Sequence, residues 1–275
     1  MGAGGGQINV APERTMMSNT LRPPAVAGLF YPENPAELRA WVRAALAEAP
    51  AHPPARYLIA PHAGWIYSGE VAAAAYRCIP PGIRRVLLMG PVHRVWTPGL
   101  ALPTVDAFLT PLGPIPLDRA AIDVLAELPG VALDDLPHRD EHCIEVHLPF
   151  LQAVIGDFTL IPAVVGGASP AMVANVIEAC DDGRTLILVS SDLSHYHDYD
   201  TAKRLDAQTA RHILSLDDHL VGEQACGAAA INGLLYYAKR HGLGAELLDL
   251  RNSGDTAGTR DRVVGYGSFA LRPAA

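Results

Sequence analysis

The chain has 275 residues, of which 49% are hydrophobic and 18% are charged, and its formal net charge is −8. This globular composition excludes the disordered class, which combines low hydropathy with high charge. An acidic chain without clusters of Lys and Arg also argues against nucleic acid or an anionic membrane as the main partner.

No apolar run approaches the roughly 18 residues that a transmembrane helix needs, and the first twenty residues lack the apolar core of a secretory signal. We therefore expect a cytoplasmic protein, with a disordered tail over residues 1–20 and a single domain over residues 21–275. The widely spaced cysteines, without a C-x-x-C pair, predict reduced thiols. They are Cys78, Cys143, Cys180 and Cys226.

Helices and strands alternate along the first half of the chain. A helix is predicted over residues 33–50, because Asn34 can cap it and Pro35 suits its first position. Ser68 is expected to start a second, alanine-rich helix. The remaining predicted elements are strands followed by loops at 56–64 and 84–93, a hairpin or edge excursion over 99–116 and a helix over 117–128.

The second half continues this alternation. Residues 141–155 are expected to be helical toward their C-terminal end, with a kink or break at Pro149. Ser169 is expected to cap the next helix. The predicted order is a strand at 158–167, a helix at 169–180, a buried strand at 185–192, helices at 200–215 and 226–241, and strands at 244–253 and 262–271.

Several of these strands are continuous apolar runs, as in "TLILV" and "RVLLM", rather than alternating ones. Strands of this kind are buried on both faces and usually alternate with covering helices. The sequence therefore predicts an α/β fold with a central mixed, largely parallel sheet flanked by helices on both faces.

Histidines follow three of the predicted buried strands. His62 follows "YLIA", His93 follows "RVLLMG", and His195 follows "LILVSSD". In open α/β sheets, ligands bind beyond the carboxyl ends of the strands, so these side chains are expected at one rim. Neutral imidazole is the commonest transition-metal ligand, and His62 and His93 are the first pair of candidate ligands.

A third ligand is expected from Asp192, Glu141 or Cys226. A thiol near a helix N-terminus has a lowered pKa, which favours Cys226, although the spacing alone slightly favours a small core cysteine packed beneath alanines. His195, close to Asp192, is a candidate general acid or base. The alternative is that Asp192 only caps the next turn.

The segment "DEHCIEVHLP" holds Glu141, His142, Glu145 and His147, but it is not the H-E-x-x-H motif of zinc proteases. Its helical spacing indicates either groups that support the site from behind or an exposed charged face. The turn "RNSGDTAG" over 251–258 is expected near the same rim. No dinucleotide or nucleotide-triphosphate motif is present, and Ser190 and Ser191 do not stand in a nucleophile elbow.

The ordered motifs "AVAGLFYP", "PHAGWIYSG", "GPVHRVWTPG", "DEHCIEVHLPFLQ", "SSDLSHY" and "ACG" resemble the Memo-like family over about residues 22–271. Its bacterial and archaeal members are called AmmeMemoRadiSam system protein B. The family is similar in fold to the catalytic subunit of class III extradiol dioxygenases, which use non-haem Fe(II). The resemblance implies that His62, His93 and Cys226 hold a metal, and that His195 and Asp192 are pocket residues.

These observations favour a non-haem metal pocket containing Fe(II), or alternatively copper, with redox or dioxygenase-like activity on an unknown small molecule or peptide. A thiolate in place of a carboxylate favours copper more than the parent site does. The alternative is a non-catalytic binding module that recognises a peptide or a pathway partner. A metal-assisted hydrolase ranks third, because few carboxylates follow the strands. The family name points to AMMECR1-like and radical S-adenosylmethionine proteins as partners.

Overall fold

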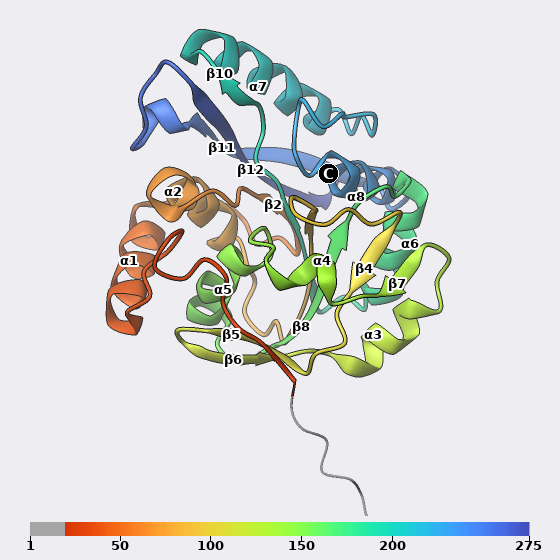
Figure 1. Cartoon of the computed structure of the whole chain (residues 1–275). Coiled ribbons are helices and arrows are strands. Elements are labelled where there is room, and N and C mark those ends of the chain that lie inside the picture. The colour runs from red at the N-terminus through yellow and green to blue at the C-terminus, as the bar shows by residue number, and fades with distance from the viewer. Residues whose placement is uncertain (1–19, 275) are drawn as a thin grey trace, which may run out of the picture.

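A computed structural model describes residues 20–274, and its central sheet has nine strands (Figure 1). The predicted tail over residues 1–20 lies, apart from Thr20, outside the described residues. The middle of the sheet is parallel, in the order β2 (Tyr57–Ala60), β9 (Thr185–Ser190), β3 (Arg85–Pro91) and β8 (Thr159–Val165).

Antiparallel pairs extend both sides of this parallel centre, so the expected mixed sheet is confirmed. β4 (Leu100–Leu102) runs antiparallel beside β8, and β7 (Val131–Leu133) pairs with β4 in parallel at the edge. Beside β2 runs β12 (Val263–Pro273), which also pairs with β11 (Leu243–Asn252) and β10 (His195–His197).

Helices cover both faces of the sheet, as predicted (Figure 1). One group contains α1 (Pro35–Glu48), α2 (Trp65–Tyr76) and α5 (Leu148–Ile155). The other contains α3 (Arg119–Ala126), α6 (Pro170–Cys180) and α8 (Ala228–Arg240), while α7 (Tyr199–Leu214) packs on β11 and β12. Within residues 20–274, no helix has the length and apolar character of a membrane span.

Short elements complete the fold. A second, three-stranded sheet consists of β1 (Leu21–Arg22), β5 (Ala107–Thr110) and β6 (Gly113–Pro116), and it contains the predicted hairpin. The remaining turns of helix are α4 (Leu136–Arg139), η1 (Glu145–His147) and η2 (Ser253–Asp255).

Two helix starts differ from the sequence predictions. The helix expected to begin at Ser68 begins at Trp65, and the Ser68 hydroxyl instead donates a hydrogen bond to the carbonyl of Ala63. Pro149 causes no break, because it stands in the first turn of α5. Backbone N–H groups in the first turn have no partner within the helix, so the N–H that proline lacks costs no helical hydrogen bond. The predicted caps Asn34 and Ser169 are both confirmed.

The register of the parallel strands sets the position of the rim. Ala60 at the end of β2 pairs with Ser190 at the end of β9, and β3 pairs with β9 on its other side. All residues of β2 and β9 are buried, as their apolar sequences require. Three neighbouring strands therefore release their following residues at one edge of the molecule.

Candidate metal centre

His62 lies just after the end of β2 and is fixed by two hydrogen bonds. Its backbone N–H donates to Asp192 Oδ1 at 2.8 Å, and its Nδ1 lies 2.6 Å from the Ser190 hydroxyl. Burial, and then the neighbouring His93, lowers the pKa of His62 well below its usual value. The ring is therefore a neutral imidazole, which is the form that binds metals.

His93 follows β3 and is fixed by one carboxylate. Glu141 accepts a hydrogen bond from the backbone N–H of His93 at 2.6 Å and contacts its Nδ1 at 2.8 Å. Burial opposes ionisation of Glu141, but hydrogen bonds from His142 and His93 outweigh it and hold the pKa of this carboxyl below its usual value. A charged carboxylate on Nδ1 leaves Nε2 of His93 free to face the site.

Cys226 reaches the site from the loop before α8. Its backbone N–H donates to the Asp192 carbonyl, and its Sγ accepts from the Asp192 N–H at 3.3 Å. The next residue must be small, since a Cβ on Gly227 would lie 2.6 Å from the Ser190 carbonyl oxygen. This close approach of α8 to the end of β9 brings the thiol to the rim.

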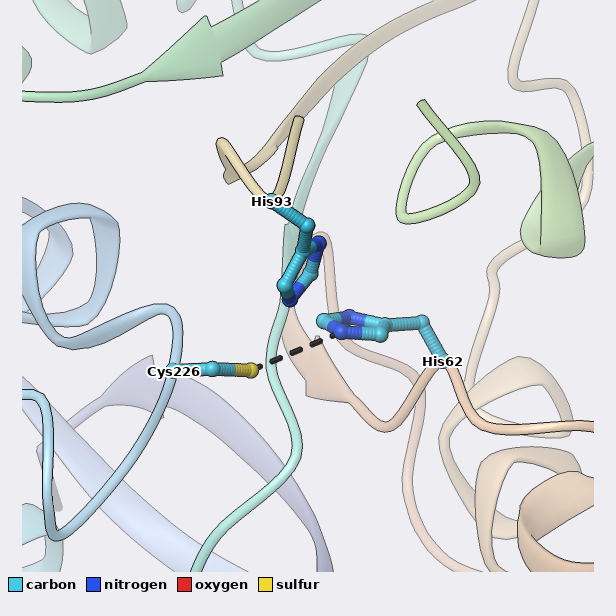
Figure 2. Close-up of side chains that lie close together, drawn as sticks. All are labelled: His62, His93 and Cys226. Carbon is cyan, nitrogen blue, oxygen red and sulfur yellow. Dashed lines mark hydrogen bonds between the residues drawn. The ribbon is translucent and has the colours of Figure 1, made fainter. Parts of the chain in front are cut away.

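The three predicted ligands converge. One ligand atom from each of His62, His93 and Cys226 lies within 4.8 Å of the others, and the Cys226 sulfur is 3.5 Å from His62 Nε2. Figure 2 shows the three side chains pointing toward one another from separate parts of the chain. Cys226 therefore lies within reach of both histidines, as a shared ligand set requires.

The acidity of the thiol differs from the sequence prediction. Burial, and next the carboxylate of Asp192, raises the pKa of Cys226 to about 12. Cys226 also lies before the first residue of α8, outside the helix, so the dipole does not compensate for desolvation. The thiol is protonated in the metal-free protein and has to lose its proton to solvent or to a base when a metal binds.

Asp192 and His195 line the same cavity. Asp192 Oδ1 accepts a hydrogen bond from the backbone N–H of His62. Over residues 20–274, no hydrogen bond joins the carboxyl group of Asp192 to His195. The side chain of Asp192 does not cap the turn that follows it, because its hydrogen bond goes to the distant His62 N–H, and the next helix, α7, is capped by Asp198. Burial raises the pKa of Asp192 above its usual value.

The cavity in front of these residues has a volume of about 720 Å³. Its floor contains His62, His93 and a third imidazole, His142, which stacks on His93 with ring centroids 4.6 Å apart. The sequence predictions included Ser253 from the turn at 251–258 but missed most of the wall. Among the lining residues for which the sequence suggested no role are Phe30, Tyr67, Tyr196, Arg262 and Tyr266, although the first three stand in motifs quoted above.

The segment around Glu141 is not the exposed charged face that was one of its two interpretations. Glu141, Glu145 and His147 are buried, and His142 is half-buried. Glu145 accepts from Arg22 at 2.5 Å and from Tyr31, which fixes the beginning of the described part of the chain to this segment. Of the two interpretations, the structure agrees with the one in which this segment supports the candidate ligands from behind, because Glu141 contacts His93. Glu141 lies in a loop, however, and not in the helix that the spacing suggested.

The donor set fits a soft or borderline metal ion. It offers two imidazole nitrogens and one thiol sulfur, and hydrogen bonds hold Nδ1 of both rings away from the site. Cys78, Cys143 and Cys180 are free thiols and all three are buried, and Cys143 lies beside the site, with its sulfur within 4.8 Å of ligand atoms of His93 and Glu141. An oxygen donor is also close by, because Oδ2 of the Asp192 carboxyl group lies 3.9 Å from His62 Nε2.

Comparisons with known proteins agree on one family. A family model described as "Memo-like protein" matches residues 22–270. A MEMO1 family protein of Archaeoglobus fulgidus is 34% identical over 92% of this chain and 100% of its own length. MEMO1 family proteins of Thermoplasma acidophilum and Thermoplasma volcanium are 35% and 34% identical, each over 90% of this chain and 97% of their own lengths.

Proposed function

Because the chain belongs to the Memo-like protein family, we propose that His62, His93 and Cys226 bind one iron or copper ion and that the cavity in front of them is a redox active site. One observation carries this proposal: three strong donor atoms from distant parts of the chain lie within 4.8 Å of one another. Two imidazoles and a thiol suit copper and iron better than magnesium or calcium, which prefer oxygen ligands.

A bound Fe(II) or copper ion would supply Lewis acidity and one-electron chemistry at the floor of the cavity. The chain's own residues position and protonate what binds there. Glu141 holds His93 in orientation, and the backbone of Asp192 holds the sulfur of Cys226. His195 on the cavity wall is the proposed general acid or base, since imidazole is the commonest group in that role.

Metal analysis of anaerobically purified protein tests the proposal. We expect close to one equivalent of iron or copper in the wild type, and a loss of this metal when His62→Ala is combined with Cys226→Ala. A thiolate-to-metal charge-transfer band should be present in the wild type and absent after Cys226→Ala, because only a coordinated thiolate gives it.

The matched control combines His241→Ala with Cys180→Ala, which removes an imidazole and a thiol away from the cavity. This control should keep the metal. The proposal is wrong if the site variant keeps its metal as the control does.

A second candidate function is a binding module, in which the cavity recognises a peptide. Exposed apolar side chains beside the cavity support it: Leu29, next to Phe30, is 81% exposed, and Ile66, next to Tyr67, is 62% exposed. Isolated exposed apolar residues are common on protein surfaces, so this observation is weaker support than the convergence of the three metal-binding side chains. A partner captured by metal-free protein, and lost after Tyr67→Ala, would favour this function.

A further inference from the structure

A chain of buried hydrogen bonds stands behind His62, on the side away from the cavity. The Ser190 hydroxyl lies 2.6 Å from His62 Nδ1 and 2.8 Å from His147 Nε2, and it donates to the carbonyl of Cys143 at 2.7 Å. Beyond it, the hydroxyl of Tyr76 contacts His147 Nδ1. All of these side chains are buried.

The position of each proton follows from the chemistry of the partners. A carbonyl oxygen only accepts hydrogen bonds, so the single proton of Ser190 is committed to Cys143. Ser190 can then only accept from the two imidazoles that contact it. His62 Nδ1 and His147 Nε2 must therefore both carry a proton.

The far end of the chain is consistent with this assignment. Burial lowers the pKa of His147 to about 3, so this ring is neutral and has one N–H. With that proton on Nε2, its Nδ1 is an acceptor, and the buried phenol of Tyr76 donates to it. No carboxylate contacts Ser190, His147 or Tyr76 through a hydrogen bond in the part of the chain that the structure describes.

We propose that Ser190, held by His147 and Tyr76, is a positioning residue that fixes the proton of His62 on Nδ1 and leaves Nε2 as a bare acceptor facing Cys226. The role in metal binding rests on the proposed function, whereas the assignment of the tautomer does not. In the metal-free protein, the thiol of Cys226, 3.5 Å away, is the donor to this same Nε2.

The two candidate histidine ligands are thus oriented by different chemistry. His93 donates its Nδ1 proton to the charged carboxylate of Glu141, and His62 donates to a neutral hydroxyl. A carboxylate partner makes an imidazole a stronger electron donor than a neutral partner does. The site therefore combines one strongly and one weakly polarised imidazole.

Nitrogen NMR of ¹⁵N-histidine-labelled, metal-free protein tests the assignment, because the chemical shifts of Nδ1 and Nε2 show which nitrogen is protonated. We expect His62 to carry its proton on Nδ1 and His147 on Nε2. In Ser190→Ala, His62 should become a mixture of tautomers, because Nδ1–H loses its acceptor. In Tyr76→Phe, which keeps the ring, the mixture should form at His147.

The controls remove equivalent hydroxyls elsewhere. Ser268→Ala removes a buried hydroxyl bonded to the carbonyl of Val71, and Tyr237→Phe removes one bonded to Asp181. Both should leave the His62 and His147 signals unchanged. A proton on Nε2 of His62 in the wild type overturns the proposal, as does a His62 tautomer that is unchanged in Ser190→Ala.

Titration with Co(II) then separates this proposal from the proposed function. Ser190→Ala should lower Co(II) affinity 10–100-fold, the range typical of lost partners behind a metal ligand. If the wild type binds no Co(II), Fe(II) or copper while the tautomers respond as expected, the metal function fails and the positioning role of Ser190 stands. If affinity is the same in Ser190→Ala and Ser268→Ala, Ser190 has no role in metal binding.

Discussion

Glu141 illustrates how a single side chain prepares the site at the scale of one residue. It accepts hydrogen bonds from the backbone N–H groups of His93, His142 and Cys143, and it contacts the Nδ1 atoms of His93 and His142. No neutral side chain has the acceptors for so many donors. Its charge therefore fixes two neighbouring rings at once.

Glu141→Gln should lower metal affinity 10–100-fold, because an amide has one acceptor oxygen and its NH₂ group would face existing donors. Titration with Fe(II) or Co(II) under anaerobic conditions measures this effect. Glu178→Gln is the control, since Glu178 contacts His241 at 2.8 Å on the surface. Equal affinities in the two variants would exclude this role of Glu141.

Asp206 is a second residue whose environment has a measurable consequence. Burial raises its pKa to about 6. Its Oδ1 accepts from the Ser194 N–H at 3.0 Å, whereas Oδ2 has no hydrogen-bond partner within residues 20–274. The native state therefore binds the carboxyl proton of Asp206 more tightly than the unfolded chain does. The contribution of protonated Asp206 to stability falls as pH rises from about 4 to about 6.

Asp206→Asn removes this ionisation and keeps the oxygen that accepts from Ser194. The wild type loses up to about 3 kcal/mol of unfolding free energy between pH 4 and pH 7 through ionisation of Asp206, from a shift of about two pKa units, and the variant should not. The difference in unfolding free energy, variant minus wild type, should therefore grow by that amount as the pH rises. Urea unfolding at both pH values measures the difference. Asp157→Asn, which makes the same substitution at an exposed position, is the control, and an equal change in both variants would contradict the role of Asp206.

At the scale of the element, the contact between α8 and the end of β9 brings Cys226 to the histidines. A Cβ on Gly227 would lie 2.6 Å from the Ser190 carbonyl oxygen and 2.7 Å from the Ser191 Cβ. Backbone atoms cannot move aside as a flexible side chain does. The start of α8 therefore depends on glycine at this position.

Gly227→Ala should lower the unfolding free energy by about 1–3 kcal/mol, the usual cost of overpacking, and should weaken metal binding by moving Cys226 away from His62. Urea unfolding and metal titration measure the two effects. Gly222→Ala is the control in the same loop, because its Cβ would meet no atom within 4 Å. A Gly227→Ala protein that matches this control would contradict the argument.

At the scale of the whole molecule, a buried ion pair connects the start of the described chain with the middle of the sequence. Arg22 contacts Glu145 at 2.5 Å, and it also donates to the carbonyls of His138 at 2.9 Å and Glu141 at 2.5 Å. Both partners of the pair are almost completely buried. The same guanidinium thus holds the segment from which Glu141 orients His93.

Arg22→Met should lower the unfolding free energy by about 3–5 kcal/mol, because it leaves the carboxylate of Glu145 buried without its cation. Chemical denaturation measures this loss. Arg139→Met removes one partner of an exposed pair with Asp140 and should cost no more than about 1 kcal/mol. A similar small effect in both variants would show that the buried pair is not needed for stability.

The sequence by itself determined the alternation of helices and strands, the caps at Asn34 and Ser169, and the rim to which His62 and His93 belong. Each of these depends on local chemistry: apolar runs, capping residues, and the rule that parallel strands end at one edge. The two-residue strand β1 and the three-residue strands β7 and β10 were not predicted, because so few residues carry too little periodicity.

Only the tertiary structure decided what surrounds the two histidines. Cys226 stands 164 residues from His62 along the chain, and the contact of its sulfur with Nε2 depends on how α8 packs on β9. Ser190 contacts Nδ1 of His62, and Glu141 contacts Nδ1 of His93. These contacts also depend on how elements distant in the sequence pack, and the sequence suggested neither of them. A short polar segment records which groups are available, but burial and direction, which set its chemistry, come from elements distant in the sequence.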